Sequence, residues 1–124
     1  MILSYRDLKV WQAAMDLVDE VHRLTKGFPR EEVYGLSMQM RRAAVSVPSN
    51  IAEGHARQST KEFLQFIAIA LGSLAELETQ LLIAARLGYL DESRLESPLA
   101  LADSIGKMLR GLQKSLRRNL VPSP

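Results

Sequence analysis

Four segments of the chain place apolar residues three or four positions apart, the spacing that forms one face of an α-helix. In the first segment, polar residues between positions 9 and 26 trace a solvated stripe beside a broad apolar arc. An arc this broad faces two neighbouring helices, as in a bundle. Ser4 and Asp7 have the spacing of a capping box before this helix. We expect Gly27 to end it in the left-handed conformation.

The second helix is expected over about residues 34–56. Pro48 lies inside it, where proline removes a backbone donor and crowds the carbonyl of Ala44. We therefore predict a kink at Pro48, which costs about 3 kcal/mol unless neighbouring groups compensate. Asn50 and Glu53 are expected to satisfy the backbone groups that the proline frees, a role that we favour over a ligand site.

The third helix, about residues 60–87, follows a second capping box and is apolar on most of its faces. Between positions 63 and 87, 17 of 25 residues are Ala, Ile, Leu or Phe. A monomeric bundle keeps one face of each helix wet, so this excess favours a second burial partner, most simply another copy of the chain. The alternative is that the alanines only favour helix formation, on a weakly apolar surface that needs no partner. The candidate interface residues are Phe63, Phe66, Ile69 and Leu77.

Gly88 is expected to close the third helix in a Schellman motif. The fourth helix begins near Asp91 or, on stronger grounds, at Ser97 with Pro98 in its first turn. Short loops force consecutive helices to run antiparallel. The chain is therefore predicted to be all-α, a single antiparallel up-and-down four-helix bundle, with residues 119–124 as a flexible tail.

The composition is that of one soluble globular domain, with 124 residues of which 47% are hydrophobic and 24% charged. The absence of cysteine excludes disulfides, thiolate metal sites and a cysteine nucleophile. The first residues do not resemble a secretory signal, and the longest unbroken apolar run, residues 66–71, is far shorter than the roughly 20 residues that span a bilayer. We expect a cytoplasmic protein that does not enter a membrane.

The net charge of +2 is small, but the last five charged residues are all positive. They are Lys107, Arg110, Lys114, Arg117 and Arg118. On a helix they fall within an arc of about 100°, where they can contact phosphates. Cations near a helix C-terminus also complement its dipole without any ligand, and this solvated-face interpretation is the more common one. No aromatic residue follows Tyr89, which argues against base stacking on single strands.

Arg41 and Arg42 are adjacent, so their side chains diverge by about 100° on a helix. We expect at least one of them to form an ion pair with Glu53, Glu76 or Glu78. The other could join the basic surface, and Arg42 is our candidate for that role.

Catalytic and metal-binding patterns are weak throughout the chain. Glu53-Gly54-His55 lacks the Glu-x-x-His spacing of di-iron bundles and has no second example, and His22 lies at the edge of an apolar arc. The sequence contains neither a nucleophile elbow nor a Gly-rich phosphate loop. We predict that the protein is not an enzyme and uses no metal or cofactor.

Several stretches, in the same order along the chain, resemble a known bacterial family. They are YRDLKVW at 5–11, MRRAAVSVPSNIAEG at 40–54, STKEF at 59–63, ALGSLAELETQL at 70–81 and LGYL at 87–90. The chain is similar over about residues 5–118 to the four-helix-bundle family named after the protein encoded in the intervening sequence of 23S ribosomal RNA genes. The accessory protein of diversity-generating retroelements resembles the same family.

The resemblance implies a homopentamer of four-helix protomers without enzymatic activity. Its retroelement branch implies binding to a reverse transcriptase and to nucleic acid. We therefore expect a non-enzymatic oligomeric binding or scaffold protein that contacts structured RNA or DNA through a basic surface. The alternatives are an adaptor for a protein partner, such as a reverse transcriptase, and a purely structural assembly.

Overall fold

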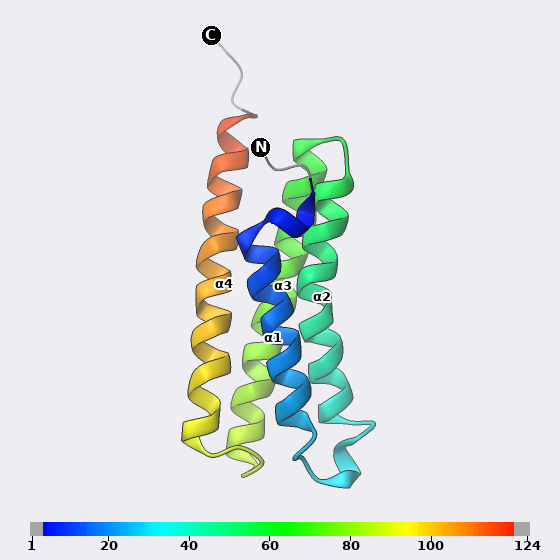
Figure 1. The fold of residues 1–124 in the computed structure, drawn as a ribbon, viewed down its shortest axis with the longest axis vertical. Helices are drawn as coiled ribbons and strands as arrows, with labels where there is room; N and C mark the ends of the chain where they lie inside the picture. Colours follow the sequence, from blue (N-terminus) through cyan, green and yellow to red (C-terminus); the bar gives the residue numbers. More distant parts are fainter. Residues whose placement is uncertain (1–3, 121–124) are drawn as a thin grey trace.

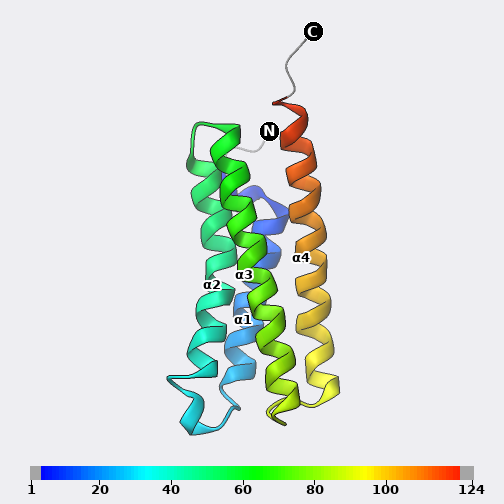
Figure 2. The ribbon, with the colours of Figure 1, turned by 180° about the vertical axis from the view of Figure 1, so that it is seen from behind.

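The periodic segments fold as four long α-helices in the computed structural model, which describes residues 4–120. One short 3-10 turn precedes the first helix and another lies between the first and the second, and no strand occurs among the described residues. The elements are η1 (Tyr5–Asp7), α1 (Lys9–Thr25), η2 (Arg30–Glu32), α2 (Leu36–Ala56), α3 (Thr60–Arg86) and α4 (Glu92–Arg118). Each long helix runs opposite to the one before it, and α4 packs beside α1, closing the ring (Figures 1 and 2). The predicted all-α up-and-down four-helix bundle is confirmed.

The start of the first helix follows the predicted capping box, but its end does not follow the predicted cap. Ser4 Oγ accepts from the Arg6 N–H at 3.1 Å, and Asp7 Oδ2 accepts from the Ser4 N–H at 3.3 Å. This box opens η1, and α1 itself begins without a side-chain cap. The expectation that Gly27 is left-handed is wrong. Its N–H donates to the Leu24 carbonyl in a right-handed turn that continues the helical bonding.

The first turn of α2 is anchored by a residue that precedes it. Glu32 Oε1 accepts from the Leu36 N–H at 3.1 Å, and Oε2 accepts from the Tyr89 hydroxyl at 2.8 Å. These hydrogen bonds lower the pKa of Glu32, and the bond to Glu32 raises the pKa of Tyr89. A Cβ on Gly35 would lie 2.6 Å from Glu32 Oε1, so glycine leaves room for the carboxylate. The contact ties the start of α2 to the turn between α3 and α4.

Helix α2 continues through Pro48, which is buried in its interior. The kink there stays a prediction. The expected rescue of the freed backbone groups is wrong, because Asn50 Nδ2 donates to the Ser46 carbonyl at 2.7 Å and not to that of Ala44. Glu53 instead lies 3.3 Å from Arg57 in an exposed ion pair.

The turn between α3 and α4 confirms one predicted cap and corrects a helix boundary. Gly88 has a φ of +82°, and the Tyr89 N–H donates to the Ala84 carbonyl as a Schellman motif requires. Asp91 Oδ1 accepts from the Arg94 N–H at 2.9 Å, so α4 begins at Glu92. The predicted start at Ser97 and Pro98 is therefore wrong. Pro98 lies buried inside α4, about two turns beyond the cap that Asp91 supplies.

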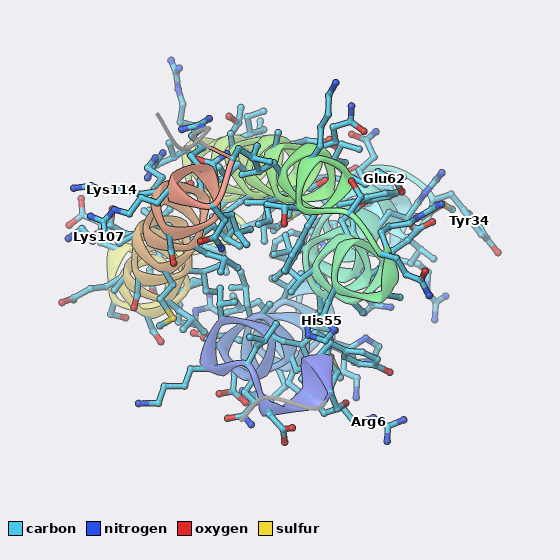
Figure 3. The ribbon with its side chains drawn as sticks, turned by 90° about the horizontal axis from the view of Figure 1, so that it is seen from above. Arg6, Tyr34, His55, Glu62, Lys107 and Lys114 are labelled. Atoms are coloured by element: carbon cyan, nitrogen blue, oxygen red, sulfur yellow. The ribbon has the colours of Figure 1, made fainter. Side chains whose placement is uncertain are left out.

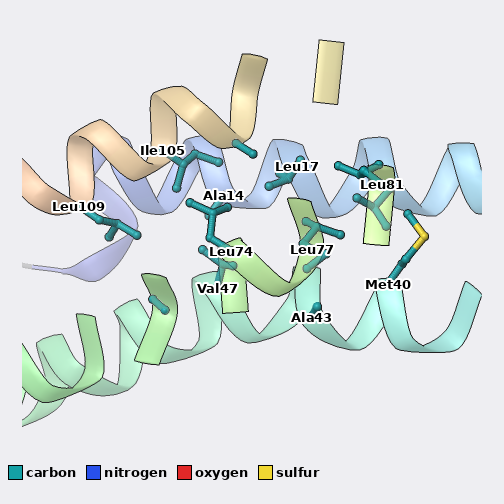
Figure 4. Close-up of a cluster of buried hydrophobic side chains, with 14 of the residues drawn as sticks. Ala14, Leu17, Met40, Ala43, Val47, Leu74, Leu77, Leu81, Ile105 and Leu109 are labelled. Atoms are coloured by element: carbon teal, nitrogen blue, oxygen red, sulfur yellow. The ribbon is translucent and has the colours of Figure 1, made fainter. Parts of the chain in front are cut away.

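The core lies along the bundle axis and takes side chains from all four helices (Figure 4). Its largest fully buried members are Leu17, Val21, Met40, Val47, Ile51, Ile67, Leu74, Leu77, Leu81, Ile105 and Leu109. The α3 residues recur at the spacing of one helix face, so the inner side of α3 is a continuous part of this core.

The ends of α2 and α3 approach each other closely at Gly54. A Cβ at this position would lie 2.6 Å from Phe66 Cβ and 2.9 Å from Phe63 Cδ1. Ser59 begins α3 nearby, where its Oγ accepts from the Glu62 N–H at 3.1 Å. The absence of a side chain on Gly54 therefore lets the two helices meet.

We predict that Gly54→Ala destabilises the protein, because the added methyl group forces Phe63 or Phe66 to move. The free energy of unfolding should fall by about 1–3 kcal/mol, as measured by urea denaturation at fixed protein concentration. Gly111→Ala is the control, since a Cβ there meets nothing within 4 Å. It should raise stability by about 0.5–1 kcal/mol. Equal effects of the two substitutions would contradict the close contact.

Candidate functional site

The five basic residues near the end of α4 form one exposed surface, which we call the basic stripe: Lys107, Arg110, Lys114, Arg117 and Arg118. Lys107 and Lys114 both extend away from the bundle on the outer side of α4 (Figure 3). Lys107, Arg110, Lys114 and Arg118 succeed each other at three or four residues, which keeps them on neighbouring parts of one helix face. The structure therefore brings these five predicted residues together on α4.

The cations of the basic stripe differ in their contacts with other groups of the protein. Lys107 Nζ lies 3.2 Å from Asp103 Oδ2, and both side chains are largely exposed. Arg110 folds back along α4, where its Nη1 lies 3.2 Å from the position of a Cβ on buried Gly106. Lys114 and Arg117 have no ion-pair partner within residues 4–120. The free positive charge therefore increases toward the end of α4, where it also complements the helix dipole.

Arg42 lies apart from the basic stripe. It is exposed on α2, which is diagonal to α4 in the ring of helices (Figure 3). It lines a groove between α2 and α3 together with Ser46, Ser73 and Glu76. The two serine hydroxyls lie 2.8 Å apart in a hydrogen bond across this groove. The prediction that placed Arg42 with the basic residues of α4 is not supported by this geometry.

Arg41 is half-buried and bonds to a hydroxyl group. Its Nε donates to Thr25 Oγ1 at 2.8 Å, joining α2 to the last turn of α1. Neither Arg41 nor Arg42 forms an ion pair in the described part of the chain. The predicted pairing with Glu53, Glu76 or Glu78 is therefore wrong, because the bundle places Thr25 within reach of Arg41.

The outward side of α3 is apolar and exposed. We call its exposed apolar positions the outer α3 face: Ala68, Ile69, Gly72, Ala75, Leu82 and Ile83. Ile69 is 50% exposed, Leu82 48% and Ile83 41%. Among the described helices, α3 alone is long and apolar enough to cross a membrane by length and composition, a test that core helices of soluble proteins also pass. Only 33% of its most apolar window is buried in the protomer.

The four predicted interface residues occupy three different environments. Ile69 lies on the outer α3 face. Phe63 and Phe66 are half-buried against the end of α2, and the Arg57 guanidinium lies 5.0 Å from the centre of the Phe66 ring. Leu77 is fully buried in the core, so its assignment to an exposed interface is corrected. It packs inside its own protomer.

Two further surfaces carry signals that the sequence did not reveal. An apolar groove of about 310 Å³ lies between α1 and α2 and is lined in part by Trp11, Met15 and Val45. At the junction of α1 and α2, a second pocket gathers Lys26, Arg30 and Arg41. Residues 26, 30 and 41 share no helical period, because a turn separates them. Only the folded chain shows that they are neighbours.

Comparisons with known proteins agree with this fold. The model of the family described as 23S rRNA-intervening sequence protein matches residues 6–111. A crystal structure of a protein of unknown function from the S23 ribosomal protein family of Bacteroides thetaiotaomicron is similar, with a TM-score of 0.79 and 26% sequence identity. The similarity covers 85% of this chain and 95% of that one. No curated protein matches the chain.

We predict that Leu77→Ala and Ile69→Ala separate the core of α3 from its outer face. Leu77→Ala should lower the free energy of unfolding by about 2–5 kcal/mol because it leaves a cavity. Ile69→Ala should change it by less than about 0.5 kcal/mol in the isolated protomer. Both are measured by denaturant unfolding at concentrations where the midpoint no longer depends on dilution. A large loss for Ile69→Ala under those conditions would show that Ile69 supports the protomer itself.

Proposed function

The chain belongs to the family of 23S rRNA-intervening sequence proteins, and we propose that it is a non-enzymatic, self-associating protein that binds structured RNA or DNA through the basic stripe. One observation carries this proposal. Five cationic side chains share the exposed outer surface of one helix, and only Lys107 among them forms an ion pair within the described residues. A surface of this kind attracts a polyanion through phosphate contacts and counterion release.

The shape of the basic stripe favours a structured nucleic acid over a single strand. From Lys107 to Arg118 it extends about 17 Å along α4 at 1.5 Å per residue, long enough to meet several phosphates. The sequence contains no Phe, Tyr or Trp after Tyr89, so α4 has no aromatic side chain on which an unpaired base could stack. Contacts to phosphates alone fix position and carry little sequence information. We therefore propose binding that depends on shape and charge.

Self-association is the second part of the proposal, and the outer α3 face supports it. Ile69, Leu82 and Ile83 expose large apolar side chains on a helix whose opposite side is already in the core. Small residues at positions 68, 72 and 75 would let another helix approach closely. The partner that we propose is another copy of the chain, and the ring of five is the number that the family resemblance implies. Several basic stripes on one assembly would bind a nucleic acid more tightly than one.

The groove between α1 and α2 supports a second candidate function, that of an adaptor for a protein partner. Met15 is 40% exposed and Val45 48% exposed on its two sides, and Trp11 and Pro48 contribute to its lining. An apolar groove between two helices suits an amphipathic helix of another protein. This candidate requires no nucleic acid, so a test of nucleic-acid binding separates the two functions.

We predict that the protein binds a double-stranded RNA or DNA probe at low salt and that its affinity falls steeply as salt rises. The triple variant Lys114→Glu, Arg117→Glu and Arg118→Glu should weaken binding by at least about tenfold, because three phosphate contacts are replaced by repulsion. Fluorescence anisotropy over a salt series measures both effects.

The control is a triple charge reversal of exposed cations elsewhere: Lys9, Arg23 and Lys61. It changes the net charge by the same amount as the triple variant of the basic stripe. If binding is specific to the basic stripe, this control should bind the probe nearly as well as the unmodified protein. Equal losses in the two triple variants would assign binding to overall charge. Failure to bind either probe at low salt would eliminate the nucleic-acid proposal.

We predict that the protein sediments at a mass well above the 13.9 kDa of one chain. Ile83→Glu should shift it toward the monomer, because a charge would be placed in an apolar contact. Met15→Glu is the matched control, since Met15 is 40% and Ile83 41% exposed but only Ile83 lies on the outer α3 face. Analytical ultracentrifugation at micromolar concentration measures both. A monomeric unmodified protein, or dissociation caused by Met15→Glu alone, would contradict the proposed interface.

A further inference from the structure

Helix α1 ends and α2 begins at the lower end of the bundle in Figure 1. A pocket of about 330 Å³ lies at this corner. We call it the corner pocket, and its lining residues are Thr25, Lys26, Phe28, Arg30, Val33, Ser37 and Arg41. These residues come from α1, from η2 and the segments flanking it, and from α2. The pocket is at the opposite end of the bundle from the last turn of α4, so it shares no residue with the basic stripe (Figure 1).

The corner pocket has a strongly positive lining. Lys26, Arg30 and Arg41 contribute three cations, and no carboxylate lines the pocket. None of the three forms an ion pair in the described part of the chain. Glu32, two residues beyond Arg30, is bonded instead to the Leu36 N–H and the Tyr89 hydroxyl. The three cations therefore face the pocket without an internal counter-charge.

The floor of the corner pocket is polar and well ordered by hydrogen bonds. Thr25 is 4% exposed and Ser37 5% exposed. Thr25 Oγ1 donates to the Val21 carbonyl at 2.8 Å and accepts from Arg41 Nε, also at 2.8 Å. A guanidinium group has five N–H donors, so this bond holds Arg41 in place while its terminal nitrogens stay available. Such an arrangement is prepared for an oxyanion before any ligand arrives.

We propose that the corner pocket binds the phosphate group of a small molecule. Three cations and the Ser37 hydroxyl group suit a dianion with several acceptor oxygens better than a single carboxylate, while Thr25 holds Arg41 in position. Phe28 and Val33 supply an apolar wall beside the charged groups. The pocket volume of about 330 Å³ is within the range of small-molecule sites. It is larger than one phosphate ion requires. The site therefore accepts a phosphate monoester whose organic part lies against Phe28 and Val33.

The test uses isothermal titration calorimetry with the full chain at constant ionic strength. The probes are inorganic phosphate, adenosine monophosphate and adenosine, with chloride as the ionic-strength control. Saturable binding of adenosine monophosphate without binding of adenosine is the expected result. Binding of inorganic phosphate alone would support the same site and identify the free ion as its ligand. Absence of saturable binding for both phosphate probes would overturn the proposal.

Lys26→Gln with Arg30→Gln is the main variant, because both side chains are exposed and neither forms an ion pair among the described residues. It should weaken binding by about tenfold or more. Lys9→Gln with Arg23→Gln removes the same charge away from the pocket and should bind normally. Equal losses in the two double variants would overturn the proposal. Arg41→Gln should also abolish binding, with circular dichroism confirming that the helices remain.

Each result is independent of the nucleic-acid proposal. Loss of phosphate binding in the corner-pocket variant should leave RNA or DNA binding by the basic stripe unchanged. Charge reversal at Lys114, Arg117 and Arg118 should leave phosphate binding unchanged. A corner-pocket variant that loses nucleic-acid binding while the protein shows no phosphate binding would overturn the small-molecule assignment.

Discussion

The inner side of α3 determines how the rest of the bundle packs. Ile67, Leu77 and Leu81 are fully buried between the other helices, and each such side chain contributes about 1.5–3 kcal/mol through removal from water. The close contact at Gly54 then brings α2 onto the same helix. Because α3 also packs against α4, its position sets where both neighbours lie. The surfaces of α2 and α4 follow from that position.

The outer side of the same helix exposes apolar side chains, and the surface of the molecule has separate apolar and cationic regions. The outer α3 face is apolar, whereas the neighbouring α4 ends in a row of cations. The α1–α2 groove is apolar, and the corner pocket at the junction of the same two helices is cationic. A net charge of +2 conceals this separation, because acidic residues balance the total, whereas within the described residues only Lys107 of the basic stripe forms an ion pair. The described residues therefore present apolar and cationic surfaces that are separate from one another.

Features that depend on local spacing, such as helices and their caps, could be predicted from the sequence. Contacts between segments that are distant in the sequence could not. Helical period located all four helices, and Gly88 closed α3 as expected. Period could not distinguish Ile69 from Leu77, because they differ by only about 80° on a helix that is apolar nearly all round. The bonds from Arg41 to Thr25 and from Tyr89 to Glu32 join residues far apart in the chain. The corner pocket includes both residues of the first of these bonds, so no spacing in the sequence predicts it.

The position of α4 beside α3 links the two parts of the proposed function. A second copy on the outer α3 face would approach the basic stripe of the first, since α3 and α4 are neighbours in the ring. Like charges brought together in this way oppose association, most strongly at low salt. A nucleic acid that neutralises the stripes removes this opposition, so binding and association are expected to strengthen each other. Reciprocal coupling of this kind would make the proposed assembly responsive to a nucleic acid without any change in the protomer fold.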